Sequence, residues 1–211
     1  MATVRTINDF KSKLAGGGAR PNLFEVSIPN FPTAATTSTP GASFNDETFQ
    51  FLCKATNMPA SNVASIDVPF RGRIFKVAGD RTIDNWSVTV INDENFVLRQ
   101  AFEAWMNAIA KLDNNTGSTS PGSYMTDAFV TQLGRGGNTR ESTKNQKGNS
   151  ASALKTYKFV DIFPVNVSAI DLSYDSSDTI EEFTVEFAVQ SFEAGDPKDL
   201  QLQNFELRIL Q

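Results

Sequence analysis

The carboxylates that could do chemistry in this chain gather between residues 171 and 193. This segment has seven acids and neither lysine nor arginine. Glu182 and Glu186 fall on one face of an alternating pattern, and two carboxylates on one face are the pair that a glycosidase uses. Strand geometry would set their Cα atoms about 13 Å apart. Nothing else in the sequence marks a sugar cleft, so we do not favour catalysis at this pair.

Two further interpretations of the acidic segment stay open at this point. The stretch DLSYDSSD at 171–178 offers the oxygen ligands that calcium prefers, but it lacks the spacing of an EF-hand loop. The segment is otherwise a solvated strand face, on which Thr184 and Gln190 lie on the same side as Glu182 and Glu186.

Residue types elsewhere exclude several kinds of active site. The chain has no histidine and one cysteine, Cys53. It therefore lacks the usual serine triad, most transition-metal sites and any intrachain disulfide. We interpret Cys53 as a small buried residue of a strand and not as a nucleophile. Gly16, Gly17 and Gly18 precede an expected strand and not a helix, which disfavours a phosphate loop. We expect neither enzymatic activity nor a cofactor.

Composition places the chain among folded globular proteins. Its 211 residues are 40% hydrophobic, enough for one sizeable core. The net charge of −5 disfavours a general nucleic-acid binder. No apolar run approaches the roughly 20 residues of a membrane span, and the first residues lack a signal core. We expect no membrane insertion and folding in a reducing cytoplasm.

The segment 67–112 carries the strongest pattern for secondary structure. Pro69, Gly72 and the Gly79–Asp80 pair indicate turns, which predicts a hairpin from 63–68 and 74–78. Trp86, Val88 and Val90 alternate as the inward face of a strand. An amphipathic helix follows. Asn92 or Asp93 is its expected cap, its apolar stripe is Leu98, Ala101, Phe102, Trp105, Ile109 and Leu112, and Asn114, Asn115 or Gly117 is its expected end.

The rest of the chain predicts further strands around this segment. They span 22–29, 48–58, 126–133, 154–163, 165–172 and 179–192. We expect a mainly β protein with two packed antiparallel sheets, sandwich-like or barrel-like, flanked by one α-helix. The whole chain, 1–211, is expected to form a single domain. It has an N-terminal arm at 1–20 with a short helix from Thr6 or Asn8, a polar loop insertion at 134–152, and a C-terminal extension at 194–211. In that extension Phe205, Leu207 and Ile209 alternate as a docking strand.

Three groups of segments, in order, resemble the tail tube proteins of contractile-tailed (myovirus-type) bacteriophages. The first group is PFRGRIFKVAGDR, NWSVTVIND and the helix with FEAWMNAI. The opening strands of the family resemble NLFEVSIP and FLCKATNMPAS, and its closing strands resemble FPVNVSAIDLSYDSSDTIEEFTVEFAVQSFE. The polar insertion at 134–152 departs from the more compact family pattern, and the C-terminal extension lies beyond the resemblance.

The resemblance implies a structural subunit of a virion tail, assembled in the host cytoplasm. Family members form homo-hexameric rings that stack into a tube, with the inner sheets joined as one barrel. Implied partners are the tail sheath protein, the tape measure protein inside, and baseplate and tube-terminator proteins. Double-stranded DNA would pass through the lumen without specific binding during genome ejection.

Two sets of residues acquire roles under this resemblance. The acidic face of Glu182, Thr184, Glu186 and Gln190 would line the lumen, because carboxylates repel phosphate and so keep DNA from adhering. The hairpin residues Phe70, Arg71, Arg73, Asp80 and Arg81 would contact neighbouring subunits or rings, although solvated turn arginines are an equal alternative. The N-terminal arm would also reach a neighbour.

Two other functions remain alternatives at this point. The first is the inner tube of a contractile injection system or of type VI secretion, whose lumen carries protein. The second, from another class, is a monomeric β-sandwich that binds carbohydrate or calcium.

Overall fold

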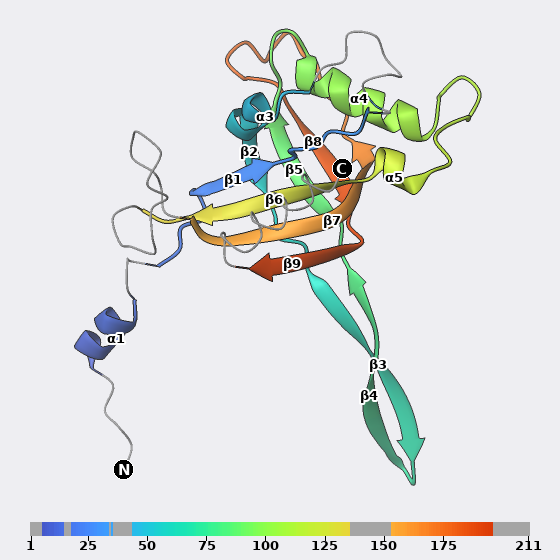
Figure 1. Ribbon diagram of the computed structural model, residues 1–211. Coiled ribbons are helices and arrows are strands. Elements are labelled where there is room, and N and C mark those ends of the chain that lie inside the picture. Colours follow the sequence, from blue (N-terminus) through green and yellow to red (C-terminus); the bar gives the residue numbers. More distant parts are fainter. Residues whose placement is uncertain (1–5, 15–17, 34, 36–43, 136–152, 196–211) are drawn as a thin grey trace, which may run out of the picture. The chain divides into compact units, whose positions relative to one another are not determined.

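The computed structural model describes residues 6–14, 18–33, 35, 44–135 and 153–195 (Figure 1). The chain divides into two compact units, which are described separately. The first comprises Met1–Val26, Phe129–Lys158 and Ala194–Gln211, and the second comprises Ser27–Ala128 and Phe159–Glu193. No helix in the described ranges is long and apolar enough to cross a membrane.

The described residues hold nine strands in two sheets, which confirms the expected mainly β fold. A seven-stranded sheet follows the order β1-β6-β7-β8-β5-β2, with β9 paired to β7, and β3 and β4 form a separate two-stranded sheet. The strands are β1 (Phe24–Ser27), β2 (Cys53–Thr56), β3 (Ser61–Phe70), β4 (Arg73–Ile83), β5 (Trp86–Ile91), β6 (Thr126–Leu133), β7 (Ala153–Val167), β8 (Glu182–Ala188) and β9 (Ser191–Gly195).

The helices with described bounds are α1 (Ile7–Lys13), α3 (Asp46–Leu52), α4 (Val97–Ile109) and α5 (Pro121–Tyr124). Helix α4 is the predicted amphipathic helix. Its first residue, Val97, donates its backbone N–H to the Asp93 carboxylate at 3.1 Å, so Asp93 supplies the expected capping oxygen. The N-cap residue itself is Phe96, in the left-handed region at φ 55°.

The core of the second unit lies between α4 and the strands β5 and β8. Trp86, Phe102, Trp105, Phe183 and Phe187 are at most 1% exposed. The ring centre of Phe187 lies 6.0 Å from that of Phe102 and 5.1 Å from that of Trp86. Since aromatic side chains bury large apolar areas, this cluster anchors the helix on the sheet. The inward alternation of β5 is therefore confirmed.

The predicted hairpin forms and is longer than the sequence pattern indicated. Strands β3 and β4 pair from Ser61–Ile83 to Phe70–Arg73, and the turn uses Arg71 and Gly72 at φ 45° and 82°. The predicted turn at Gly79 and Asp80 is wrong, because both residues lie inside β4 at a register irregularity. Such a bulge inserts an extra residue without reversing the strand, and glycine accommodates the close approach there.

Four of the predicted strands differ from the observed elements. Residues 48–52 of the predicted strand 48–58 lie instead in α3, because Asn45 caps this helix by accepting from the N–H groups of Glu47 and Thr48. The predicted strand 154–163 and the first residues of the predicted strand 165–172 form one strand, β7, which ends at Val167, so residues 168–172 are not a strand. The pairing of β7 with β8 continues past Pro164 through an irregular register, which compensates for the missing N–H donor of proline.

The third difference is that the strand predicted at 179–192 is shorter and is followed by a second strand. Strand β8 ends at Ala188, and β9 begins at Ser191.

Helix α4 ends at Ile109, earlier than the end predicted at Asn114, Asn115 or Gly117. Leu112 lies beyond this end and is 97% exposed, so its place in the apolar stripe was also wrong. By contrast, Leu98, Ala101, Phe102 and Trp105 of that stripe are buried as predicted.

The first unit contains the N-terminal helix and parts of β1, β6 and β7. Thr6 caps α1 in a capping box with Asp9, whose carboxylate accepts from the Thr6 backbone N–H at 2.9 Å. Leu133 donates its backbone N–H to the Leu23 carbonyl at 2.8 Å. Most of the predicted insertion at 134–152 and of the extension at 194–211, including Phe205, Leu207 and Ile209, lies outside the described residues.

Candidate functional site

Strands β2, β5 and β8 present one polar face opposite the aromatic core. In the antiparallel register Ser87 pairs with Glu186, Thr89 with Thr184, and Ile91 with Glu182. The Thr89 and Thr184 hydroxyls lie 3.2 Å apart. We call this surface, which comprises Ser87, Thr89, Ile91, Glu182, Thr184 and Glu186, the polar sheet face. Its alternate neighbours Phe183, Val185 and Phe187 are buried, so the sequence predicted the two faces of β8 correctly.

A lysine from the edge strand reaches this face. Lys54 lies on β2, which pairs with β5, and its ammonium group forms an ion pair with the Glu182 carboxylate on β8. Its side chain therefore spans the intervening strand. No ion pair in the described residues involves Glu186. Of the residues predicted for this face, Gln190 lies apart, in the bend between β8 and β9.

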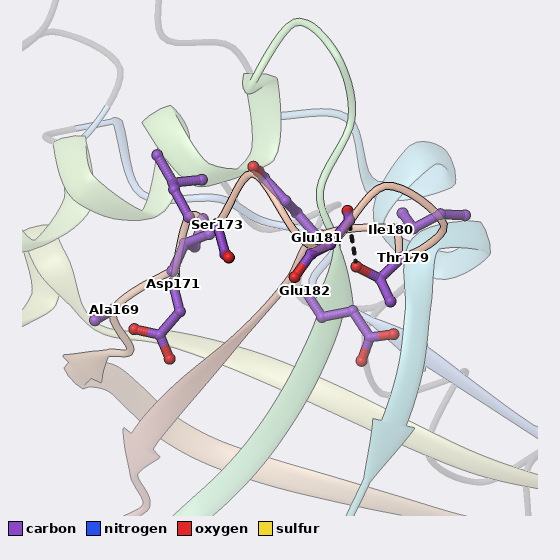
Figure 2. Close-up of a pocket in the computed structure, with 10 residues that line it drawn as sticks. Ala169, Asp171, Ser173, Thr179, Ile180, Glu181 and Glu182 are labelled. Carbon is purple, nitrogen blue, oxygen red and sulfur yellow. Dashed lines mark hydrogen bonds between the residues drawn. The ribbon is translucent and has the colours of Figure 1, made fainter.

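The loop 168–181 leads into β8 and borders a shallow polar pocket. The pocket has a volume of about 350 Å³, and Asp171, Glu181 and Glu182 are among the side chains that line it (Figure 2). The described residues contain no cluster of three histidine, cysteine or acidic side chains that could hold a metal ion. The calcium site considered for 171–178 therefore has no ligand cluster to support it.

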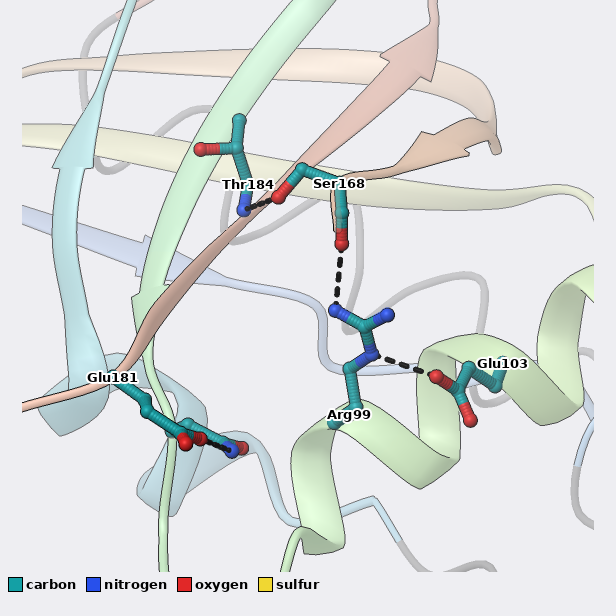
Figure 3. Close-up of polar contacts among 6 residues, drawn as sticks. Arg99, Glu103, Ser168, Glu181 and Thr184 are labelled. Carbon is teal, nitrogen blue, oxygen red and sulfur yellow. Dashed lines mark hydrogen bonds and ion pairs between the residues drawn. The ribbon is translucent and has the colours of Figure 1, made fainter. Parts of the chain in front are cut away.

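Arg99 of α4 fastens the start of this loop. It donates one N–H to the Ser168 carbonyl at 2.7 Å and another to the Glu103 carboxylate at 2.6 Å (Figure 3). Its guanidinium also lies 5.3 Å from the centre of the Phe183 ring. The Ser168 hydroxyl in turn accepts the backbone N–H of Thr184 at 2.9 Å. These contacts connect helix, loop and β8, and so position the polar sheet face at its Glu182 end.

The hairpin β3–β4 has one apolar face and one mixed face. In its register Ile66 pairs with Val77 and Val68 with Phe75, and residues directly opposite one another share a face. With Phe70, these residues form a surface that we call the apolar hairpin face. Each of its five side chains is between 42% and 66% exposed.

The other face of the hairpin is more polar and is closed by an ion pair. Lys76 contacts Asp67 at 2.6 Å, and Pro69 pairs with Ile74 next to them. Soluble proteins seldom leave a contiguous apolar strip of this kind uncovered. The side chains of this strip keep between 42% and 66% of their surface exposed, so the described residues leave the strip largely uncovered.

The structure separates the hairpin residues that the resemblance singled out. Phe70 and Arg73 face one another at the tip, and the Arg71 guanidinium lies 5.5 Å from the Phe70 ring centre. Asp80 lies in the bulge, and Arg81 donates to the Ser61 hydroxyl near the base of the hairpin. They do not form one cluster.

Sequence reasoning missed most of the apolar hairpin face. The alternation of Ile66 with Val68 and of Phe75 with Val77 is visible in the sequence and could have revealed it. No sequence signal indicates that Lys54 pairs with Glu182, because their contact depends on a register across three strands.

Comparison with known proteins identifies the family. Residues 19–194 match the phage tail tube protein family. The chain is also 35% identical over 179 residues to tail tube protein gp19 of Enterobacteria phage T4, covering 85% of this chain and 93% of that protein. The chain belongs to the phage tail tube protein family. It is thus a structural component of a bacteriophage tail, which confirms the resemblance on the segments described above.

Two further matches extend this picture. The tail tube protein is 26% identical over 183 residues to the tail tube protein of Serratia phage KSP90, covering 85% of this chain and 91% of that protein. In three dimensions it resembles a chain of the anti-feeding prophage baseplate with a TM-score of 0.55 and 12% identity, over 84% of this chain and 95% of the other. At that identity the likeness establishes a shared fold alone.

Proposed function

We propose that this tail tube protein assembles into hexameric rings, which stack into a tube whose lumen conducts double-stranded DNA during genome ejection. The observation that carries the proposal is the presence of two different surfaces in one unit, of which the polar one is half-buried and the apolar one is exposed. One is a polar sheet face without an apolar cluster, and the other is an apolar hairpin face without a cover. The first suits a surface in contact with water and DNA, and the second suits contact between protein subunits.

The polar sheet face is the proposed lumen lining, with Glu182, Thr184 and Glu186 at its centre and Gln190 beyond the end of β8. Non-specific DNA binding grows with each phosphate that a lysine or arginine neutralises. The three strands β2, β5 and β8 carry Lys54 as their single basic residue, and it is paired with a carboxylate. The remaining polar groups on this face are mainly hydroxyls, which hold water and allow hydrated DNA to slide.

The apolar hairpin face is the proposed contact with a neighbouring subunit or ring. Burial of its five exposed apolar side chains would supply the non-directional part of the association free energy. Phe70, Arg71 and Arg73 at the tip would supply orientation, because a guanidinium binds carboxylates in a fixed geometry. Asp80 and Arg81, at the base, are proposed to lie in the same contact.

The proposed partners follow from the family and from its solved relatives. The structures with a similar fold include a baseplate of the anti-feeding prophage and a sheath–tube complex of an extracellular contractile injection system, the latter with a TM-score of 0.52. We expect this protein to contact a tail sheath protein, baseplate and terminator proteins, and a tape measure protein inside the tube. We expect assembly in the host cytoplasm, without membrane insertion and without enzymatic activity.

The competing function is a tube that conducts protein, because the solved structures of contractile injection systems have a similar fold. The 35% identity to a phage tail tube protein favours DNA as the cargo.

Electron microscopy of the purified full-length chain at low and high concentration tests the proposal. We expect hollow rings or stacked tubes, with six-fold symmetry in end-on views. Monomers that persist in the presence of purified baseplates, which remove any need for another template, would contradict it. Sections through assembled tubes in which the polar sheet face points outward would contradict the lumen assignment.

A further inference from the structure

Three ionisable side chains decide the charge of the polar sheet face. Strands β2, β5 and β8 contain one lysine, Lys54, and two glutamates, Glu182 and Glu186, together with no other lysine, arginine, aspartate or glutamate. These strands therefore have a net charge of −1 and not the −2 that β8 alone carries. The charge that a passing phosphate meets depends on where the lysine is held.

The local backbone explains why Lys54 points to this face. The register of β2 against β5 shifts between Cys53, which pairs with Val90, and Ala55, which pairs with Thr89. Cys53 is half-buried, and burial raises the pKa of its thiol to about 12. Lys54 occupies the irregular position between them, where its long stem crosses β5 to reach Glu182.

The pair remains in contact with solvent. The side chains of Lys54 and Glu182 are 53% and 33% exposed. An exposed ion pair contributes little to folding, so its effect on stability does not explain its position. The pair has a larger effect on the local electrostatic field, because each side chain neutralises the full charge of the other at the surface.

We propose that Glu182 serves to hold Lys54 away from DNA, and that Lys54 in turn sets the net charge of the conducting surface. The proposal rests on the proposed function, because the polar sheet face must line the lumen for DNA to meet it. Glu186 then supplies the uncompensated carboxylate that repels phosphate. Glu182 acts as a positioning residue for a cation that would otherwise bind the backbone of the passing duplex.

Removing one member of the pair shifts the net charge of the polar sheet face in one direction, and removing the other shifts it in the opposite direction. Removing Glu182 releases one lysine per subunit into the lumen and brings the three-residue charge to zero. Removing Lys54 brings it to −2 and adds no cation. Removing both restores −1. Since a hexameric ring repeats each change six times and rings stack, even weak phosphate contacts accumulate along the tube.

Four sets of virions test the proposal: wild type, Glu182→Gln, Lys54→Gln, and Lys54→Gln with Glu182→Gln. The readout is the rate of DNA release from purified particles between 20 and 200 mM salt. We expect Glu182→Gln to slow release at least threefold at 20 mM salt. One phosphate contact weakens roughly eightfold over this range, so the delay should vanish at 200 mM. Lys54→Gln should not slow release, and the double variant should behave like wild type.

Normal release by Glu182→Gln at low salt would overturn the inference. So would a double variant that is as slow as Glu182→Gln, since the freed lysine is then not the cause. Electron microscopy of the same particles verifies that each variant builds full-length tubes, so that a defect in assembly is not mistaken for slow release.

A separate measurement distinguishes failure of the proposed function. Thr184→Cys is placed in a Cys53→Ala background, and assembled tubes are exposed to a small maleimide and to a polymer-linked maleimide too large for the lumen. Reaction with both reagents would put the polar sheet face outside and would overturn the lumen assignment together with the inference. Reaction with the small reagent alone supports the lumen assignment, and the release assay then decides the role of Lys54.

Discussion

Replacing Phe75 with serine should impair assembly of the tail tube protein while leaving the subunit folded. Phe75 lies on the apolar hairpin face and is 66% exposed in the subunit. A phenylalanine side chain buries about 200 Å² when fully covered, so closure of a neighbour over Phe75 would remove about 130 Å² from water. At about 25 cal/mol per Å² this contributes about 3 kcal/mol to one contact.

The expected effect on assembly follows from this free energy. About 3 kcal/mol corresponds to a change of roughly 100-fold in an association constant, and ordering of the contact lowers the realised value. We therefore expect the concentration of free subunit at equilibrium with tubes to rise at least tenfold. Sedimentation of assembled tubes, followed by quantification of the supernatant, measures this concentration directly.

Ile74 provides a matched control. It is adjacent to Phe75 in the sequence and is 65% exposed. It pairs with Pro69 across the hairpin, so its side chain lies on the face away from Phe75. Ile74→Ser loses a similar preference for β-structure, so both variants should change the urea midpoint of the free subunit alike. The reasoning is refuted if Phe75→Ser assembles at the wild-type concentration, or if the two variants impair assembly equally.

Three further predictions concern the lumen, the end of α4 and the buried thiol. Lys at both Glu182 and Glu186 should allow tubes to assemble but slow genome release, because each subunit then offers cations to DNA; release at the wild-type rate from verified mutant tubes would sink the lumen assignment. Gly117→Ala should lower the free energy of unfolding by about 2 kcal/mol, because a Cβ there would lie 1.9 Å from the carbonyl oxygen of the last residue of α4. Gly122→Ala, which has open space around it, should leave the free energy of unfolding unchanged. Urea unfolding of both variants measures the difference. Burial raises the pKa of Cys53 to about 12 from an ordinary value of 9.0, so between these pH values the folded chain keeps a proton that the unfolded chain loses. The free energy of unfolding should therefore fall as pH rises from about 9 to 12, and Cys53→Ala should lack this part of the slope.

Alternation predicted those elements whose two faces meet different surroundings. Strand β5 buries Trp86 and Val88 as predicted, and β6 has the predicted bounds of residues 126–133. Helix α3 was missed because its sequence also shows alternation. Phe49 and Phe51 alternate as in a strand, but only Phe49 is buried and Phe51 is 80% exposed. The capping oxygen of Asn45 decided the local structure instead.

Tertiary pairing determined what the sequence could not predict at the candidate site. The polar residues of β8 were identified from alternation alone. The contact between Lys54 and Glu182 joins residues far apart in the sequence and depends on a bulge in β2, which no local pattern announces. Likewise, Pro164 suggested a break between two strands, but the register irregularity allows β7 to continue past it.

The architecture ties the chemistry of the proposed lumen to the packing of the core. Because side chains alternate along β8, a shift of one residue against β5 would place Phe183, Val185 and Phe187 on the polar sheet face and bury both glutamates. The aromatic contacts of Phe187 with Trp86 and Trp105 oppose that shift. Arg99 opposes it from the other end, since it holds the carbonyl of Ser168, whose hydroxyl accepts from Thr184 in β8. The buried cluster that folds the subunit thus also fixes which residues DNA would meet, so core substitutions that loosen this register should alter genome release before they prevent folding.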